Sequence, residues 1–259
     1  MKKYLIFFSI FILFNSLSAE ESFKESKSTH FVIFYQNAGD DFVKTVLEKA
    51  EFYYDRIAED LGFRRFDFWL WDNRAKIYIY DDAKSYQAAS GQPSWSGGAA
   101  LLDYKIIQTF NLAGDFLDTI LPHELGHIIF REFVGFNNPG IPLWLEEGVA
   151  SYQEKSKYSQ AGIFCRKAIA EGNFMDLKKL SSFYRVTSLD LELVNIFYAE
   201  SFSIVDFLIK SFGRDKFVLF CQNLRDCENL EKAIRLTYPF GSLEGLDKAW
   251  VNFLKNGDF

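Results

Sequence analysis

Five consecutive residues, His123-Glu124-Leu125-Gly126-His127, constrain this chain more than any other feature of its sequence. On a helix the two histidines occupy positions i and i+4, so both imidazoles project from one face and can bind one metal ion. Glu124 projects about 100° around the helix from His123, which places it badly for binding the same ion. It can instead accept a proton from a water molecule bound there. The pattern predicts a helix with a hydrolytic zinc site.

A carboxylate further along the chain would complete that site. Two imidazoles and one carboxylate are good zinc ligands, and such a set leaves the fourth tetrahedral position for water. Glu146 and Glu147 follow at a suitable distance, and the spacing alone admits either. Zinc in such a set lowers the pKa of its water and polarises a substrate carbonyl. We therefore expect one Zn²⁺ per chain, with Glu124 acting first as base and then as acid.

Length and composition favour one large domain or two lobes that share a cleft. The chain has 259 residues, of which 49% are hydrophobic and 18% aromatic, and this supports a sizeable core. The net charge is −6 and no stripe of Lys and Arg occurs, so we do not expect nucleic acid as a partner. The sequence does not indicate an oligomeric state.

The first 19 residues have the composition of a signal peptide. Lys2 and Lys3 are followed by an apolar run from Tyr4 to Phe14 and by small or polar residues up to Ala19, where cleavage is expected. The apolar run is short for a membrane span, and nothing after residue 20 resembles one. We expect an exported protein, periplasmic or secreted, with a single mature domain over residues 20–259 and no stable membrane span.

Hydrophobic periodicity predicts an α+β fold. Alternation and β-branched content predict strands at 31–35 and 75–80 and one or two strands within 99–110. Spacings of three and four predict a helix from Asp40 that Gly62 ends, and a short helix around 83–89. From Asp115 the pattern is helical almost to the end. The expected helices there are 115–134, 142–155, 160–171, 192–212, 214–225, 228–237 and 242–255.

These elements predict a small mixed-sheet lobe over about residues 23–112, followed by a mainly helical lobe over 113–259. The helix of the two histidines lies at their junction. Pro122 either kinks a continuous helix or marks the first turn of a new one.

The chain resembles the gluzincin metallopeptidases. In one branch the third-ligand helix contains a motif like Trp-Leu-Asn-Glu-Gly-Phe-Ala, and Trp144 to Ala150 match it, with Glu147 at the position of the ligand and Glu146 at that of the Asn. The resemblance implies a zincin core in which His123, His127 and Glu147 bind zinc. It extends to smaller peptidase-MA-like proteins, whose strand, turn and tyrosine-led helix motifs are similar to residues 30–35, 92–98 and 198–208.

The same resemblance implies further site residues. Tyr198 is expected to stabilise the oxyanion, as a Tyr or His does in similar gluzincins, unless it is a core tyrosine. Zinc-bound histidines usually donate their other N–H to a carboxylate. One gluzincin branch has an Asp four residues after the ligand, where this chain has Ser151, so Asp118 or Glu200 is expected to substitute.

The segment Gly97 to Ala99 has two interpretations. It is either an edge strand whose backbone pairs with an extended peptide or a plain turn into a strand. The aminopeptidase branch has a glutamate in its Gly-Ala-Met-Glu-Asn motif, whereas Ala100 and Leu101 follow here. This absence favours cleavage within chains over removal of N-terminal residues.

We therefore interpret the chain as an exported zinc metallopeptidase with a peptide or protein substrate, and as an endopeptidase. Two alternatives stay open: a non-catalytic binding module in the cell envelope on the same scaffold, and a zinc hydrolase of a non-protein amide or ester. The cysteines also leave two possibilities, a disulfide between Cys221 and Cys227 with Cys165 left over, or three small buried side chains.

Overall fold

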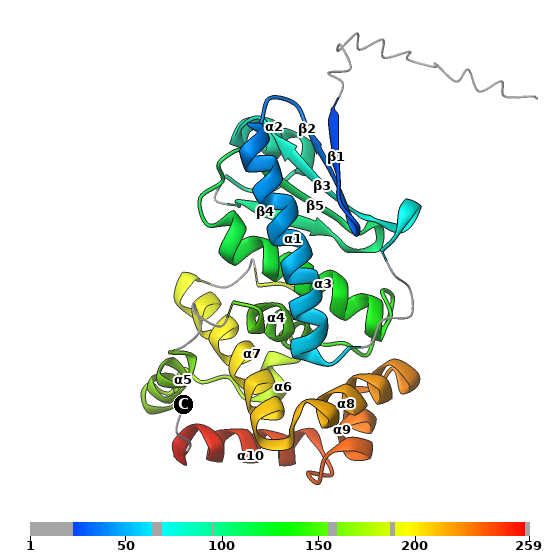
Figure 1. The fold of residues 1–259 in the computed structure, drawn as a ribbon. Helices are drawn as coiled ribbons and strands as arrows, with labels where there is room; N and C mark the ends of the chain where they lie inside the picture. The colour runs from blue at the N-terminus through cyan, green and yellow to red at the C-terminus, as the bar shows by residue number, and fades with distance from the viewer. Residues whose placement is uncertain (1–22, 64–68, 95, 155–159, 187–189, 257–259) are drawn as a thin grey trace, which may run out of the picture.

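The computed structural model describes residues 23–63, 69–94, 96–154, 160–186 and 190–256, and shows a sheet lobe followed by a helical lobe (Figure 1). This agrees with the predicted fold class. The predicted signal peptide, residues 1–19, lies outside the described residues. Within the described ranges, no helix combines the length and the apolar character that crossing a membrane requires.

The sheet lobe contains five strands in the order β1-β2-β3-β5-β4. The central pairs β2–β3 and β3–β5 are parallel, and the outer strands β1 and β4 are antiparallel to their neighbours. β4 therefore has one open edge. The bounds are β1 Lys24–Lys27, β2 Phe31–Tyr35, β3 Ala75–Tyr80, β4 Gly98–Leu101 and β5 Ile106–Phe110. Helices α1 (Asp40–Leu61) and α2 (Ala83–Ser90) complete this lobe.

The predicted strands at 31–35 and 75–80 are confirmed residue for residue. β3 buries Ala75, Ile77 and Ile79 on one face, which is the alternation seen in the sequence. β1 was not predicted, because its sequence Lys-Glu-Ser-Lys is polar throughout and mostly exposed. An outer strand needs no hydrophobic pattern, since charged side chains are common on sheet edges.

The helical lobe follows the predicted pattern closely. The bounds are α3 Leu121–Val134, α4 Leu143–Tyr152, α5 Ala161–Glu171, α6 Leu177–Leu180, α7 Leu191–Phe212, α8 Arg214–Cys227, α9 Leu230–Thr237 and α10 Leu243–Asn256. The short α6 was not expected. It is a single turn in which the side chain of Asp176 accepts the N–H of Lys179, and four residues are too few to show a helical period.

The predicted helix 115–134 consists of two parts. A π-helical turn over Phe116–Ile120 continues directly into α3, and Pro122 lies in the first turn of α3. There its missing N–H costs little, because the first N–H groups of an α-helix have no partner within the helix. The proline thus marks the start of the α-helix that contains the two histidines.

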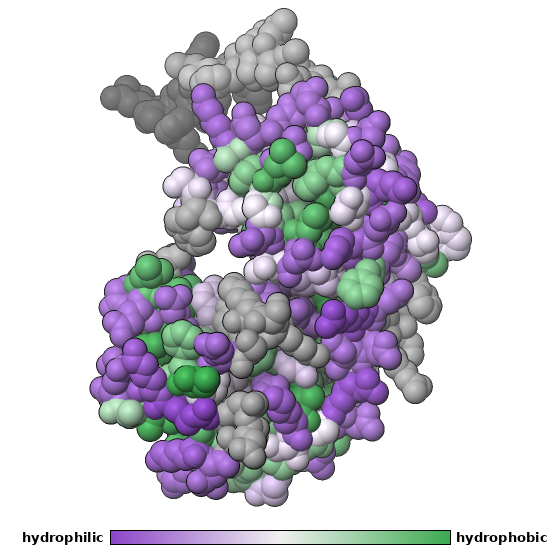
Figure 2. All heavy atoms as spheres, turned by 60° about the vertical axis from the view of Figure 1, so that its left-hand side comes forward, coloured by the Kyte–Doolittle hydropathy of each residue, from purple (hydrophilic) through white to green (hydrophobic). Residues whose placement is uncertain are grey.

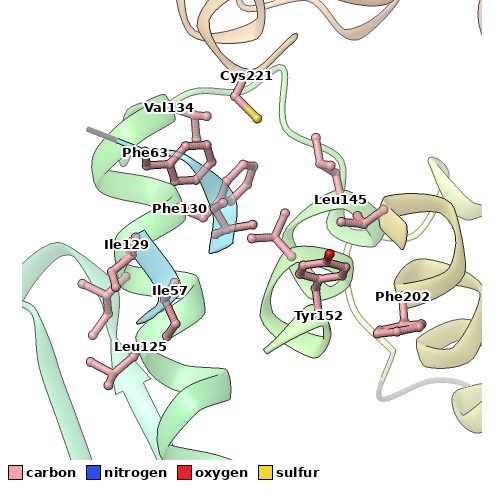
Figure 3. Close-up of a cluster of buried hydrophobic side chains, with 14 of the residues drawn as sticks. Ile57, Phe63, Leu125, Ile129, Phe130, Val134, Leu145, Tyr152, Phe202 and Cys221 are labelled. Atoms are coloured by element: carbon pink, nitrogen blue, oxygen red, sulfur yellow. The ribbon is translucent and has the colours of Figure 1, made fainter. Parts of the chain in front are cut away.

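α3 is anchored in the main hydrophobic core. Phe130 and Val134 of α3 lie beside Phe63, which follows α1, and Tyr152 of α4 faces Phe202 of α7 (Figure 3). The rings of Tyr152 and Phe202 are stacked with their centroids 6.1 Å apart. The core therefore fixes α3, α4 and α7 relative to one another, and these three helices supply most of the site described below.

All three cysteines are free thiols. Cys165 and Cys221 are buried, and Cys227 is partly exposed. Cys221 and Cys227 both lie on α8, where six residues correspond to a rise of about 9 Å, beyond the span of a disulfide. The structure supports the alternative without a disulfide, but only Cys165 and Cys221 are buried as that alternative expected.

Candidate active site

Three side chains from α3 and α4 place their ligand atoms together. The Nε2 atoms of His123 and His127 are 3.1 Å apart. Oε2 of Glu147 lies 3.5 Å from the first and 3.6 Å from the second. His, His and Glu thus form a compact cluster in which each residue offers one atom.

The cluster has the dimensions of a tetrahedral zinc site. Zinc–nitrogen distances of about 2.0–2.1 Å at tetrahedral angles separate neighbouring ligand atoms by about 3.3 Å. Oε2 of Glu147 is buried without a hydrogen-bond partner. Leaving a buried acceptor unsatisfied costs about 1–3 kcal/mol, and more when the group is charged. A cation among the three atoms would compensate that oxygen and both ring nitrogens. The donor set therefore fits a metal ion.

Electrostatics in the cluster favour positive charge. Burial lowers the pKa of His123, but the neighbouring carboxylates of Glu147 and Glu154 outweigh burial and raise the pKa to about 10. Burial raises the pKa of Glu147, whereas the charges of His127 and His123 depress it well below its ordinary value. The carboxylates thus attract either protons or a metal ion to the histidines, so metal binding displaces protons.

The two adjacent glutamates of α4 face different partners. Glu147 reaches the histidine Nε2 atoms, whereas Glu146 accepts two hydrogen bonds from Arg131, at 2.7 Å from Nε and 2.5 Å from Nη2. Neighbouring helical residues point about 100° apart, so only Glu147 reaches the Nε2 atoms, while Oε1 of Glu146 lies 3.9 Å from Nδ1 of His127, beyond hydrogen-bond distance. Gly148 sets the position of α4, because a Cβ there would lie 2.2 Å from the carbonyl oxygen of Ser201 on α7.

Glu154 is a site residue that the sequence argument missed. Its Oε1 lies 2.7 Å from Nδ1 of His123, and its side chain is buried. The Nδ1–H of the imidazole donates to this carboxylate, which leaves Nε2 free to bind a metal. The predicted helix 142–155 would place Glu147 and Glu154 on one face, since they are seven residues apart, but α4 ends at Tyr152 and Glu154 lies in the turn that follows it.

Neither expected substitute for this carboxylate contacts the histidines. Asp118 accepts hydrogen bonds from Lys49, at 2.7 Å, and from the hydroxyl of Tyr53. Glu200 is fully buried and accepts the backbone N–H of Met175. Both expectations were wrong, because sequence distance from the motif gave no measure of distance in space.

A cavity of about 630 Å³ lies beside the cluster, between the two lobes, and the molecular outline is indented there (Figure 2). Its wall includes His123 of the metal cluster and the nearby carboxylates Glu124 and Glu154. Gly97 and Gly98 line it from the sheet lobe, and α5 and α7 line it from the helical lobe. Tyr198 is among the α7 residues. The structure therefore brings Glu124 and Tyr198, both predicted site residues, to the same cavity.

Comparison with protein-family models gives a match to the peptidase MA superfamily over residues 70–256. This stretch begins before β3 and includes the metal cluster, Glu124 and Tyr198. The chain belongs to the peptidase MA superfamily. Among curated proteins, no match to the chain is found. The membership confirms the resemblance drawn from the motifs and supports a metallopeptidase-like hydrolase with a peptide substrate. Peptidase MA proteins are typically metal-dependent, in agreement with the cluster of His123, His127 and Glu147.

Proposed function

We propose that the chain is an exported, zinc-dependent endopeptidase of gluzincin type. The main support is the clustering of three ligand atoms, from His123, His127 and Glu147, beside a cavity that His123 and Glu124 line. Two imidazoles and one carboxylate form a catalytic zinc set with one position open. Export follows from the composition of residues 1–19 and places the enzyme in the periplasm or outside the cell.

Each residue has a defined task in this proposal. His123 and His127 bind the ion through Nε2, and Glu154 holds His123 in the required tautomer. When bound, zinc polarises the substrate carbonyl and acidifies a water molecule. Glu124 accepts the proton of this water and delivers it to the leaving amine. Tyr198, on the α7 wall, donates a hydrogen bond to the oxyanion as it develops.

The open edge of β4 is the proposed binding site for the substrate main chain. In the described part of the chain β4 pairs only with β5, and its first residue, Gly98, lines the cavity together with the preceding Gly97. An extended peptide can add to such an edge through main-chain hydrogen bonds. Gly98, Ala99 and Ala100 are small, which permits a close approach. No carboxylate on β4 is available to hold a free amino terminus, and this favours cleavage within chains.

The substitution Glu124→Gln tests the mechanism. We expect kcat to fall by about 10²–10⁴-fold, because an amide cannot accept the proton, while zinc stays bound. Cleavage of a peptide library is measured beside the zinc content of the same preparations. Glu171→Gln on the exposed face of α5 makes the same charge change away from the cavity and serves as the control.

Hydrolysis by Glu124→Gln at the wild-type rate would contradict the mechanism. Zinc below about a tenth of an equivalent after metal-replete expression would contradict the metal assignment. Cleavage of a non-protein amide or ester by the wild type, with no peptide cleaved, would instead support the alternative hydrolase.

A further inference from the structure

Three buried hydroxyl groups hold the end of β4 that lines the cavity. The hydroxyl of Tyr86 on α2 lies 2.8 Å from Oγ of Ser96, and Ser96 donates to the carbonyl of Gly98 at 3.0 Å. Thr109 on β5 donates through Oγ1 to the carbonyl of Gly97 at 2.7 Å. We call Tyr86, Ser96 and Thr109 the hydroxyl clamp.

The direction of the hydrogen bonds in the clamp follows from counting protons. Ser96 has one hydroxyl proton and gives it to Gly98, so the hydroxyl of Tyr86 must donate to Ser96. Tyr86 and Thr109 are fully buried, and Ser96 is nearly so. A buried network in which every hydroxyl is satisfied restricts the backbone to which it is bonded. Two consecutive carbonyls, at Gly97 and Gly98, are therefore fixed.

Gly97 and Gly98, which the hydroxyl clamp holds, pack closely against the residue that precedes α3. A Cβ at Gly97 or at Gly98 would lie 2.7 Å from the side chain of Ile120, so a larger residue at either position would displace Ile120. Ile120 immediately precedes α3, and His123 follows it by three residues. Hydrogen bonds from one side and Ile120 from the other therefore set where β4 lies relative to the metal cluster.

We propose that the hydroxyl clamp positions β4 for binding the main chain of an extended peptide substrate. This inference rests on the proposed function and deepens it: Tyr86, Ser96 and Thr109 act through Gly97 and Gly98 and do not touch the reacting atoms. They are positioning residues. β4 is four residues long, so a substrate must extend over several residues to use the aligned edge.

Tyr86→Phe is the main test, because it removes the hydroxyl and keeps the buried ring. For an eight-residue peptide substrate, we expect KM to rise about 3–10-fold, which corresponds to one net hydrogen bond, with kcat changed less than about twofold. For a blocked dipeptide substrate, too short to reach along β4, KM should stay at the wild-type value. Thr109→Val should follow Tyr86→Phe, and Thr109→Ser, which keeps the hydroxyl, should restore the wild-type KM.

Thr45→Ala provides a matched control. The hydroxyl of Thr45 donates to the backbone carbonyl of Asp41 at 2.8 Å, on α1 and away from the clamp. Its loss should leave KM for both substrates unchanged. Amide hydrogen exchange over residues 97–101 gives a measure that does not depend on activity, and Tyr86→Phe should speed exchange there while zinc content stays constant.

An unchanged KM for the long peptide in Tyr86→Phe, or equal changes for the long and the short substrate, would overturn the proposal. A fall in kcat at constant KM would do the same. If the wild type cleaves the peptide but the clamp variants give one of these contradictory results, the clamp proposal is wrong and the proposed function stands. If the zinc-loaded wild type neither binds nor cleaves any peptide, the proposed function fails and the clamp proposal fails with it.

Discussion

The two lobes bury different kinds of polar side chain. Among the described residues of the sheet lobe, the buried polar side chains are neutral. In the helical lobe they include a histidine and four carboxylates. The sheet-lobe set is Ser96, Gln108 and Thr109, and the helical-lobe carboxylates are Glu146, Glu154, Glu200 and Asp206.

This difference indicates that the sheet lobe uses its buried polar groups to position the backbone, whereas the helical lobe uses them for charge chemistry. A neutral hydroxyl is satisfied by a single local hydrogen bond, as Thr109 is by the carbonyl of Gly97. A buried carboxylate requires a cation or a proton, because an isolated charge is costly to bury. Glu146 has Arg131 and Glu154 has His123. The helical lobe is therefore suited to bind a metal ion and to transfer protons, and the sheet lobe to hold a strand in place.

The largest expected effect is a difference in zinc affinity between variants of the two adjacent glutamates of the helical lobe. Glu147→Gln should lower zinc affinity by more than about 100-fold, beyond the loss typical of an outer partner, because a direct ligand is removed. Glu146→Gln should lower it by less than about tenfold, since this side chain faces Arg131. Competition with a chelating dye measures both affinities. Equal losses in the two variants would contradict the assignment of Glu147 as the ligand.

The next effect concerns the pH dependence of folding. Burial raises the pKa of Glu200 from 4.5 to about 8. The folded protein therefore keeps a proton that the unfolded chain releases, so this group stabilises the fold fully below about pH 4.5 and the contribution is lost as pH rises to about 8. The loss is on the order of 4 kcal/mol.

Glu200→Gln should remove that loss, so its unfolding free energy should fall less than that of the wild type between pH 5 and pH 8. Urea unfolding at several pH values measures the difference. Thr109→Val in the sheet lobe, which removes a neutral hydroxyl, should lower stability equally at each pH. A parallel pH profile for Glu200→Gln and the wild type would show that Glu200 does not retain its proton.

A smaller effect is expected at the carboxylate that supports His123. Glu154→Gln should lower zinc affinity by about 10–100-fold, because the amide is a weaker acceptor for the Nδ1–H. Asp118→Asn, at a residue that pairs with Lys49 instead, is the control and should leave zinc affinity unchanged. Similar losses in the two variants would mean that the effect is one of overall charge and that Glu154 has no specific contact role.

The sequence was most informative where structure depends on neighbours along the chain. An apolar, β-branched run gave β2, alternation gave β3, and the spacing of three and four gave α1 and most helices of the second lobe. The exceptions have local causes. β1 has no buried face to mark it, α6 is a single turn, and the chain before Pro122 forms a π-helical turn where an α-helix was expected.

The metal cluster itself follows from local geometry and one resemblance. Helical geometry places His123 and His127 on one face whatever the rest of the fold, so their pairing can be predicted from five residues of sequence. The choice of Glu147 over Glu146 came from the match to the gluzincin motif, and the structure places Glu147 beside both histidines.

Contacts between distant segments were decided only by the tertiary structure. Tyr86 lies on α2 and Ser96 in the loop before β4, and Ile120 packs against Gly97 and Gly98 in the cavity wall. Helical and strand periods fix directions within one element but carry no information on how two elements pack. The residues positioned for a metal ion were therefore visible in the sequence, whereas those that fix the position of β4 emerged only from the packing of the tertiary structure.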